Sequence, residues 1–409
     1  MKTITSASGA ETTLSEFATA PAPWQLLAAF LLAVAGYLAL YHGHLQPFLL
    51  SDAHVYATAL DVWMHGGDPY GADHFGALRF VYPPIVLFAG APLARLFPAN
   101  SGWPIYLAIS FASAFALPVV MARYYFQQQW LNPFFALLIF FAAPQFGGLL
   151  ALESGNMACL LYLLIFLAGI PGLSRNQWGW FYGVVFFAAL IKVNFLLMLA
   201  LPVFAGANQW IRSSGCTIAT MAVYLLQKIF MPGLYSAYQR SLRFVLIDED
   251  GYGYGVFGSL ARLDRKFHHS IGAMPYLLTA GFVLLLFISL VLLRRRLPVD
   301  STDGLWLTLL IVAVVLANPR LLHYDACIAM PAVFVLLVNA LRPRQPLWVF
   351  VGLFLVSLAV AIFVRSVPTK GGYELVLMLG SFAIVYWQLW REAAASSSSE
   401  LVAAESAQS

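Results

Sequence analysis

Long apolar runs recur along the chain and constrain its fold more than any other feature of the sequence. A helix needs about 20 predominantly apolar residues to cross the hydrocarbon core of a bilayer. Twelve runs approach or reach this length, and each is expected to be a span: residues 24–41, 83–98, 103–122, 131–150, 155–171, 178–205, 213–232, 274–293, 304–320, 325–341, 346–364 and 373–390. Only 10% of the residues are charged, against about 25% in a soluble domain. The sequence therefore predicts an all-α polytopic membrane protein with one transmembrane domain, residues 24–390.

Two of these runs are weak candidates for a full crossing. The run at 83–98 is short, and Pro144 interrupts the run at 131–150. If either run does not cross, the turn Glu153–Asn156 lies on the opposite side of the membrane. The two ends of the chain are rich in Ser and Ala and are expected to be disordered: residues 1–23 and 391–409.

Arginine clusters at the ends of the later runs set the expected orientation. They share one side of the membrane in a twelve-span count and comprise Arg294–Arg296, Arg342 with Arg344, and Arg391. Because basic residues favour the cytoplasmic side of a membrane, both termini are expected inside the cell. The polar segments then expected outside are 43–82, 233–273 and Asn318–Asp325. The first half of the chain gives a tied count, with Arg79, Arg123 and Arg175 outside against Lys2, Arg95 and Arg212 inside.

The first polar loop carries a carboxylate, Asp52, after the apolar run that begins at Trp24. Apolar residues follow at intervals of three and four and predict a short helix with one apolar face: Val55, Tyr56, Ala59, Leu60 and Trp63. Asp52 in the first turn of that helix suits its unpaired N–H groups. Such a helix is expected to lie flat at the membrane surface, and a capping role for Asp52 is the alternative to a catalytic one.

The whole loop resembles the first extracytoplasmic loop of glycosyltransferase family 87, the polyprenol-phosphate-mannose-dependent membrane mannosyltransferases of GT-C type. The matching residues are Asp52, Tyr56, Ala59, Gly66, Pro69-Tyr70 and Tyr82-Pro83-Pro84. The resemblance covers most of residues 24–345 and implies that Asp52 is the catalytic base. It also implies a GT-C-like bundle of about 12 transmembrane helices in the cytoplasmic (inner) membrane. The extracytoplasmic loops 43–82 and 233–273 then carry short interfacial helices, and the active site faces outside the cytoplasm.

Two further motifs have both a functional and a structural interpretation. Lys192 lies inside an apolar run, where burying a charge is expensive, and is either a donor-phosphate ligand or a packing lysine bound to a carbonyl. Family 87 has a Lys-Pro step in the matching span, and this chain has Lys192-Val193. The sequence Glu153-Ser154-Gly155-Asn156 resembles that family's Gly-Gln-x-Asn motif in a different order, and a plain turn between helices is the alternative.

The junction Asn318–Asp325 is a candidate phosphate site. A guanidinium such as that of Arg320 can hold phosphate oxygens in a bidentate way, and His323 can donate a further hydrogen bond. Anchoring to lipid headgroups is the alternative. The remaining residues expected to bind substrate are Asp325, the loop arginines Arg240 and Arg243, and the tyrosines Tyr56, Tyr70 and Tyr82.

These features favour a glycosyltransferase that moves a hexose, with mannose as the expected sugar, from a polyprenyl-phosphate donor to an acceptor hydroxyl. The expected partners are that donor, an envelope lipid or glycan acceptor, and membrane lipids, and no nucleic acid. No metal or other cofactor is indicated, because His54, His65 and His74 have no recognised ligand spacing. A transporter or flippase of a lipid-linked or amphipathic solute is the main alternative. A non-catalytic assembly subunit is a third, and it predicts that Asp52 and Arg320 are replaceable.

Overall fold

The computed structural model describes residues 19–41, 50–71, 79–96, 99–142, 147–248, 251–268, 271–297, 303–363 and 367–406, and all the regular structure in these ranges is helical. Five of the described helices are long and apolar enough to cross a membrane: residues 104–126, 158–175, 274–296, 346–363 and 372–394. A sixth span is added if the bent pair 210–230 and 232–246 is counted as one. The chain is therefore an all-α polytopic membrane protein.

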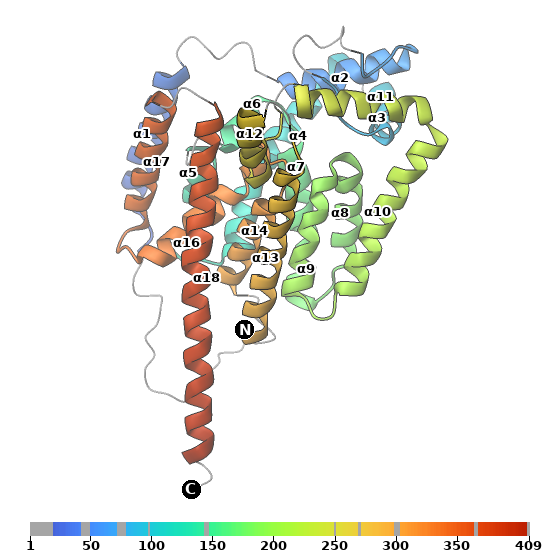
Figure 1. Cartoon of the computed structure of the whole chain (residues 1–409). Coiled ribbons are helices and arrows are strands. Elements are labelled where there is room, and N and C mark those ends of the chain that lie inside the picture. The colour runs from blue at the N-terminus through green and yellow to red at the C-terminus, as the bar shows by residue number, and fades with distance from the viewer. Residues whose placement is uncertain are drawn as a thin grey trace.

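Most helices run along the bundle in Figure 1. They are α1 (Pro23–Tyr41), α4 (Ala99–Val120), α5 (Pro133–Ala142), α7 (Ala158–Arg175), α8 (Gly179–Ile191), α9 (Ala200–Ala205), α10 (Trp210–Phe230), α13 (Met274–Arg296), α14 (Gly304–Leu316), α16 (Ala329–Leu341), α17 (Pro346–Phe363) and α18 (Val367–Ser406). The short helix α6 (Gly147–Glu153) lies at the top of the bundle, between α5 and α7 in the chain. Short irregular helices extend three elements: the π-helices η3 (Met121–Phe126) and η5 (Phe244–Asp248) and the 3₁₀-helix η4 (Val193–Leu199).

A second group of helices gathers at one end of the bundle, at the top of Figure 1, and we call this the α2 end. It consists of α2 (Ser51–Met64), α3 (Pro84–Leu96), α11 (Pro232–Arg243), α12 (Val256–His268) and the short α15 (His323–Ala326). Helix α10 meets α11 at a bend of 115°, so α11 turns away from the direction of the bundle. The predicted short helix after Asp52 is α2, which buries Val55 and Ala59 as its apolar spacing indicates.

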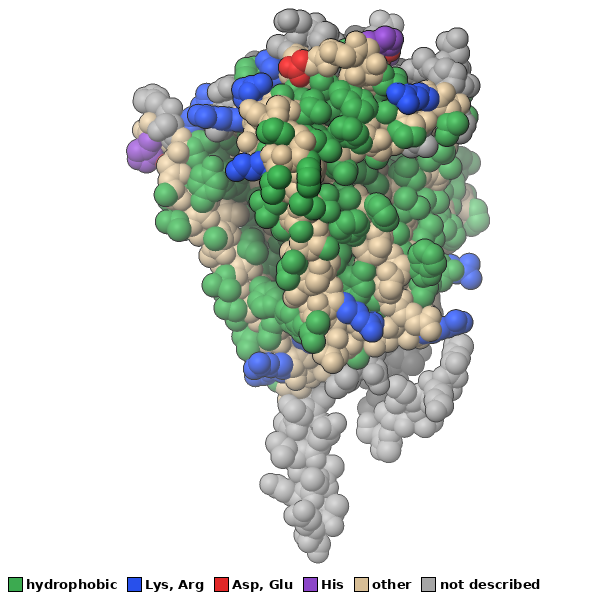
Figure 2. All heavy atoms as spheres, turned by 90° about the vertical axis from the view of Figure 1, so that its right-hand side faces the viewer, with side chains coloured by type: hydrophobic (Ala, Val, Ile, Leu, Met, Phe, Trp, Pro, Cys, Tyr) green, Lys and Arg blue, Asp and Glu red, His purple; other side chains and the backbone are tan. Residues whose placement is uncertain are grey.

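The centre of the bundle is formed by helices that are apolar on every side. Nearly every residue of α14 is buried, and most of α16 is buried against it. A helix without a polar face is stable only inside a protein or a membrane. Outer helices such as α10 and α13 instead leave large apolar side chains uncovered, among them Ile218, Leu225, Ile229, Leu284 and Leu285. Figure 2 shows one such apolar face, with Lys and Arg side chains towards its upper and lower edges.

The segment 83–98 does not cross the bundle, contrary to the sequence-based expectation. Its helix α3 packs along α2, where the Trp63 and Phe88 ring centroids lie 4.7 Å apart and Gly90 faces Leu60. Helix α4 then begins at the same end. Its position there is shown by the Tyr106 hydroxyl, which donates a 2.5 Å hydrogen bond to the carbonyl of Gly155, a residue close to α2. The apolar residues of α3 are therefore used in packing at the α2 end.

The segment 178–205 was expected to be one span and is instead a helical hairpin. Helix α8 rises to Ile191, Lys192 adopts an extended conformation, and η4 and α9 return to the starting end. The two feet of the hairpin are joined there by the Ala207 N–H, which donates to Asn176 Oδ1 at 3.2 Å. Lys192 consequently lies at the tip of the hairpin, at the α2 end.

These two differences change the expected side of several residues. The turn Glu153–Asn156 lies beside α2, whereas a strict alternation of the twelve runs puts it opposite Asp52. Arg123 and Arg175 were expected on the side of Asp52, and they instead lie at the same end of the bundle as Arg294–Arg296, which we call the arginine end. Two contacts of the segment that follows Arg296 show this.

Gly304 packs on the carbonyl of Phe126, near Arg123, and the Trp306 indole donates to the carbonyl of Phe204, at the foot of the hairpin near Arg175.

Candidate active site

Asp52 is held at the start of α2 by the turn that follows α6. Leu50, with a φ of 59°, brings the chain into position so that its N–H donates to the Glu153 carbonyl at 2.6 Å. The Asp52 N–H donates to the Ser154 carbonyl at 2.9 Å. Leu50, the residue before α2, makes no side-chain hydrogen bond that caps this helix. The Asp52 carboxylate is thus in the first turn as predicted, but it is directed to another element rather than to its own helix.

That element is the turn carrying Asn156, whose Nδ2 donates to Asp52 Oδ2 at 2.7 Å. The orientation of the Asn156 amide is fixed from its other side, because Oδ1 accepts from the Ala158 N–H at 2.9 Å and from Lys192 Nζ at 3.2 Å. Only the NH₂ group is therefore left to face the carboxylate. Asn156 engages one Asp52 oxygen, and the Ser154 side chain also hydrogen-bonds to the carboxylate.

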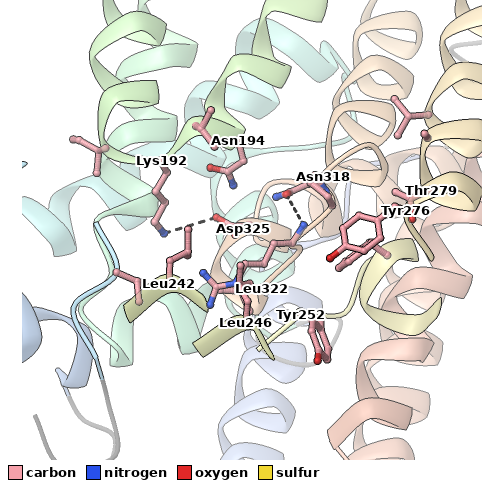
Figure 3. A pocket seen from close by; sticks show the side chains of 18 of the residues that line it. Lys192, Asn194, Leu242, Leu246, Tyr252, Tyr276, Thr279, Asn318, Leu322 and Asp325 are labelled. Atoms are coloured by element: carbon pink, nitrogen blue, oxygen red, sulfur yellow. Dashed lines mark hydrogen bonds and ion pairs between the residues drawn. The ribbon is translucent and has the colours of Figure 1, made fainter. Parts of the chain in front are cut away.

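Lys192 connects this carboxylate to a second one. Its ammonium lies 4.0 Å from Asp325 Oδ1, and the two side chains are only 13% and 3% exposed. It also lies 4.1 Å from the centroid of the Tyr324 ring, which is within range of a cation–π contact. Figure 3 shows the Lys192 side chain pointing from the hairpin tip towards Asp325. The ammonium is thus placed between two carboxylate-bearing segments that are far apart in the sequence.

The protonation of Asp52 is set by opposing effects. Burial raises its pKa above the ordinary value because the charged form is poorly solvated. The Asn156 hydrogen bond and the Lys192 charge act in the opposite direction, and Ser154 and Arg320 add smaller effects of the same sign. The net result is a carboxyl group with a raised pKa, which makes its carboxylate a stronger base than an exposed aspartate.

Arg320 is anchored by its backbone and by one edge of its side chain. Its N–H donates to Asn318 Oδ1 at 3.1 Å, and its Nε donates to the Gly251 carbonyl at 2.8 Å. Within the described part of the chain, that carbonyl is the only group to which the guanidinium donates. The junction also holds the 233–273 loop through the Tyr254 N–H, which donates to the Leu321 carbonyl at 2.6 Å. The terminal N–H groups of Arg320 can therefore bind an anion.

His323 is the first residue of α15, and its side chain lies outside the described residues. Its predicted contact with phosphate stays a prediction.

Lys192, Arg320 and Asp325 line one large cavity of about 820 Å³. Asn194, Asn318 and Tyr324 line the same cavity. Much of the remaining lining is apolar and comes from α13 and the α10–η5 region: Tyr224, Leu242, Leu246, Tyr276, Ala280, Val283, Leu284 and Phe287. Figure 3 shows how side chains of the hairpin, the Asn318–Asp325 junction and α13 surround this space. A cavity of this kind fits an amphipathic ligand with a charged head.

The three predicted tyrosines form one cluster beside the cavity. The Tyr56 and Tyr82 hydroxyl groups are 2.8 Å apart, and the Tyr70 hydroxyl donates to the Tyr82 carbonyl at 2.8 Å. Of the three, only Tyr82 lines the large cavity. Arg240 and Arg243 do not line it either. They border a second pocket of about 320 Å³ together with Tyr70.

The structure also identifies polar residues that the sequence did not single out as ligands. Asn156 was assigned to a motif, with a plain turn as the alternative, and it directly contacts Asp52. Asn194 and Tyr324 were unassigned, and both line the cavity beside Lys192. The sequence feature that could have identified Asn194 and Tyr324 is their position close to a charged residue in or beside an apolar run. Among the described residues, no three His, Cys, Asp or Glu side chains are grouped so that they could hold a metal ion.

No protein-family model matches the chain, and comparison with curated proteins gives no match.

Proposed function

We propose that the chain is a membrane glycosyltransferase of GT-C type, which moves a hexose, with mannose as the expected sugar, from a polyprenyl-phosphate donor to a hydroxyl of an envelope lipid or glycan. The observation that carries this proposal is the connected set Asp52–Asn156–Lys192–Asp325, of which Lys192 and Asp325 line a cavity whose walls are mostly apolar and Asp52 and Asn156 lie behind Lys192, outside that lining. A lipid-linked sugar has the matching chemistry, since its phosphate is anionic and its prenyl chain is apolar. The resemblance of the first loop to family 87 points the same way.

In the proposed reaction Asp52 is the general base. Its carboxylate takes the proton of the acceptor hydroxyl while the acceptor oxygen bonds to the anomeric carbon. The bond between that carbon and the phosphate oxygen breaks at the same time, and the electron pair leaves with polyprenyl phosphate. Because one displacement occurs with one base, the anomeric configuration inverts. The leaving phosphate is stable as an anion, so no acid catalyst is required.

Lys192 and Arg320 offset the negative charge of the phosphate in this scheme. The charges of these two cations are equal in number to those of the two carboxylates, Asp52 and Asp325. Lys192 is 4.0 Å from Asp325, longer than a close ion pair, so its ammonium can turn to a phosphate in exchange for this contact and for the 3.2 Å bond to Asn156. Arg320 presents its terminal N–H groups, and His323 is proposed to add a hydrogen bond.

The proposed topology has about twelve crossings with the α2 end outside the cytoplasm. Each connection at the arginine end is flanked by an arginine: Arg123, Arg175, Arg212, Arg294–Arg296, Arg342 and Arg391. Basic residues beside short connections favour the cytoplasmic side. The hairpin at Lys192 contributes two crossings and α3 contributes none. The proposed number of crossings therefore stays at about twelve, although the runs 83–98 and 178–205 do not each form one span.

The direct test is incubation of reconstituted protein with labelled polyprenyl-phosphate-mannose and a lipid extract of the cell envelope. Transfer of label to the extract is the expected result, and no transfer to any fraction contradicts the proposal. The alternative, a transporter or flippase, predicts that intact labelled donor changes leaflet without loss of its sugar. A protected-leaflet assay on the same vesicles measures that outcome.

A further inference from the structure

The second pocket has a composition that the proposed transfer reaction does not use. It lies between α11 and the chain that leads into α3, and we call it the α11 pocket. Its lining residues are Asp68, Tyr70, Arg79, Ala237, Arg240, Ser241, Arg243 and Phe244. Among the described residues, three arginines and one aspartate therefore line a pocket of about 320 Å³. Like charges that share a pocket repel, and a bound anion relieves that repulsion.

Asp68, the one acid among the described residues that line the α11 pocket, is already engaged. Asp68 Oδ1 accepts from the Tyr70 N–H at 3.0 Å within its own turn. Arg240 donates to the Ser236 hydroxyl at 2.9 Å, a neutral partner on the preceding turn of α11. In the described part of the chain, neither Arg240 nor Arg243 forms an ion pair, and both are exposed. The positive charge of the pocket is thus not neutralised by these neighbours.

The walls of the pocket are held in a fixed relation. The guanidinium carbon of Arg79 lies 3.6 Å from the centroid of the Phe244 ring, so the ring sets the plane of the guanidinium and leaves its edge for hydrogen bonds. The Ser241 hydroxyl donates to the Phe80 carbonyl at 2.8 Å and ties α11 to the segment carrying Arg79. Arginines arranged in this way suit a tetrahedral oxyanion better than mobile surface lysines do.

The α11 pocket is next to the large cavity but separate from it. Tyr70 lines the pocket, and its hydroxyl donates to the carbonyl of Tyr82, which lines the cavity. The Tyr70 ring also packs 6.1 Å, centroid to centroid, from the ring of Tyr238, another cavity residue. A tyrosine wall therefore stands between the two spaces. The uncovered apolar side chains Ile229 and Phe230 end just before α11, so the pocket lies beyond the apolar surface, at the level of lipid headgroups.

We propose that the α11 pocket is a binding site for a phosphate group, held by Arg79, Arg240 and Arg243. The phosphate belongs either to an anionic lipid headgroup or to a free phosphate, because both present the same tetrahedral oxyanion. This assignment differs from the sequence-based expectation that Arg240 and Arg243 bind the substrate of the transfer reaction. It does not depend on the transfer chemistry, since no member of the Asp52–Asp325 set lines the pocket.

The test measures binding to the purified full chain in non-ionic detergent by titration calorimetry, with two probes. One is inorganic phosphate and the other is short-chain phosphatidylglycerol, with short-chain phosphatidylcholine as the uncharged reference. The parent protein is expected to bind at least one anionic probe saturably and less tightly at high salt. The variant Arg240→Gln/Arg243→Gln is expected to lose affinity by about 10-fold or more, the effect of removing charge-assisted hydrogen bonds.

Three controls make the outcomes distinct. Arg212→Gln, at the opposite end of α10, removes one charge from the protein and should bind as the parent does. Arg243→Lys keeps the charge without the planar fork and should weaken binding only partly, which remains informative if the double variant folds poorly. Asp52→Asn should bind the probes normally, so failure of the transfer proposal leaves this result unaffected.

Preference for phosphatidylglycerol identifies a headgroup site, and preference for inorganic phosphate identifies a free-phosphate site. Absence of saturable binding, or equal affinity in the double variant, overturns the assignment.

Discussion

Asn156 Nδ2 lies 2.7 Å from Asp52 Oδ2, although 104 residues separate the two in the chain. The contact is made possible by the backbone pairing of Leu50 and Asp52 with the carbonyls of Glu153 and Ser154. The same asparagine accepts from Lys192, so three segments far apart in sequence share one amide. Replacement of any member is therefore expected to affect the positions of the others.

Replacement of Asp52 by Asn tests its role as the base. Asn keeps the size of the side chain and removes the proton acceptor, so transfer should fall by a factor on the order of 10²–10⁴. The melting temperature should change little, since a partly buried charge is removed and no helix cap is lost. Asp52→Glu should also be slow, because the longer side chain displaces the carboxylate.

The matched control is Asp61→Asn on the same helix. The Asp61 side chain is 71% exposed, and this variant should transfer sugar at the parental rate. If Asp52→Asn is as active as Asp61→Asn, Asp52 is not the base.

The pH dependence of transfer should show the raised pKa of Asp52. Only the carboxylate can accept a proton, so the rate should fall as the pH drops through a pKa that burial places above 3.8. Asn156→Ala removes a hydrogen bond that favours the charged form, so it should move this acid limb to higher pH. An alanine variant with a lower rate but an unchanged pH profile contradicts the proposed action of Asn156 on the carboxyl group.

The class of fold and the first helix of the site could be predicted because both depend on local chemistry. Apolar runs in a membrane must form helices to satisfy their backbone groups, so the all-α class follows from composition. The three- and four-residue spacing after Asp52 gave the helix α2 and the burial of Val55 and Ala59. These inferences need no knowledge of which segments meet.

Run length could not distinguish a crossing from other uses of an apolar segment. The run 178–205 is about 42 Å long as a single helix, more than the roughly 30 Å of a bilayer core. Its length and the central Lys192 are the signals of a hairpin that the expectation of one span overlooked. The contact of Asn156 with Asp52 was equally hidden, because it depends on where α3 and α6 lie rather than on either motif alone.

Cysteine labelling distinguishes the observed fold from simple alternation of the runs. The three native cysteines of the protein are first replaced. In intact cells, an impermeant thiol reagent should then label Gln239→Cys on α11 and should not label Arg175→Cys at the arginine end. Both positions are exposed, so access from the aqueous side decides the result. Alternation of the twelve runs predicts that both are labelled. Labelling of Arg175→Cys alone reverses the proposed orientation.

Gly155 should be intolerant of a side chain. Its φ is +64°, and an added Cβ would lie 2.9 Å from the Ala53 Cβ on α2. Gly155→Ala should therefore cost about 1–3 kcal/mol of local stability and displace the turn from Asp52, which lowers transfer. Gly215→Ala on α10, where an added Cβ meets nothing within 4 Å, is the control. Equal activity of the two variants would show that the turn need not hold its position.

Arg320 is expected to act on the donor phosphate and also to hold the 233–273 loop, and the two roles can be separated. Arg320→Ala removes both the free N–H groups and the 2.8 Å bond to the Gly251 carbonyl. Arg262→Ala also removes contacts with this loop, among them the 2.7 Å bond to the Gly253 carbonyl and the position of the guanidinium over the Tyr254 ring, and Arg262 does not line the cavity. If Arg320 binds phosphate, Arg320→Ala should raise the KM for the lipid donor about 10-fold or more, while the acceptor KM stays near the parental value.

Arg320→Lys should restore donor use only in part, because an ammonium cannot reproduce the bidentate fork. Arg262→Ala should leave the donor KM close to that of the parent, since the loop is still held by the Tyr254 N–H to the Leu321 carbonyl. The measurement is a donor titration at saturating acceptor for all three variants, with melting temperatures recorded alongside. If Arg262→Ala raises the donor KM as much as Arg320→Ala does, the arginine at 320 acts by positioning the loop, and the phosphate must be bound by Lys192 and its neighbours instead.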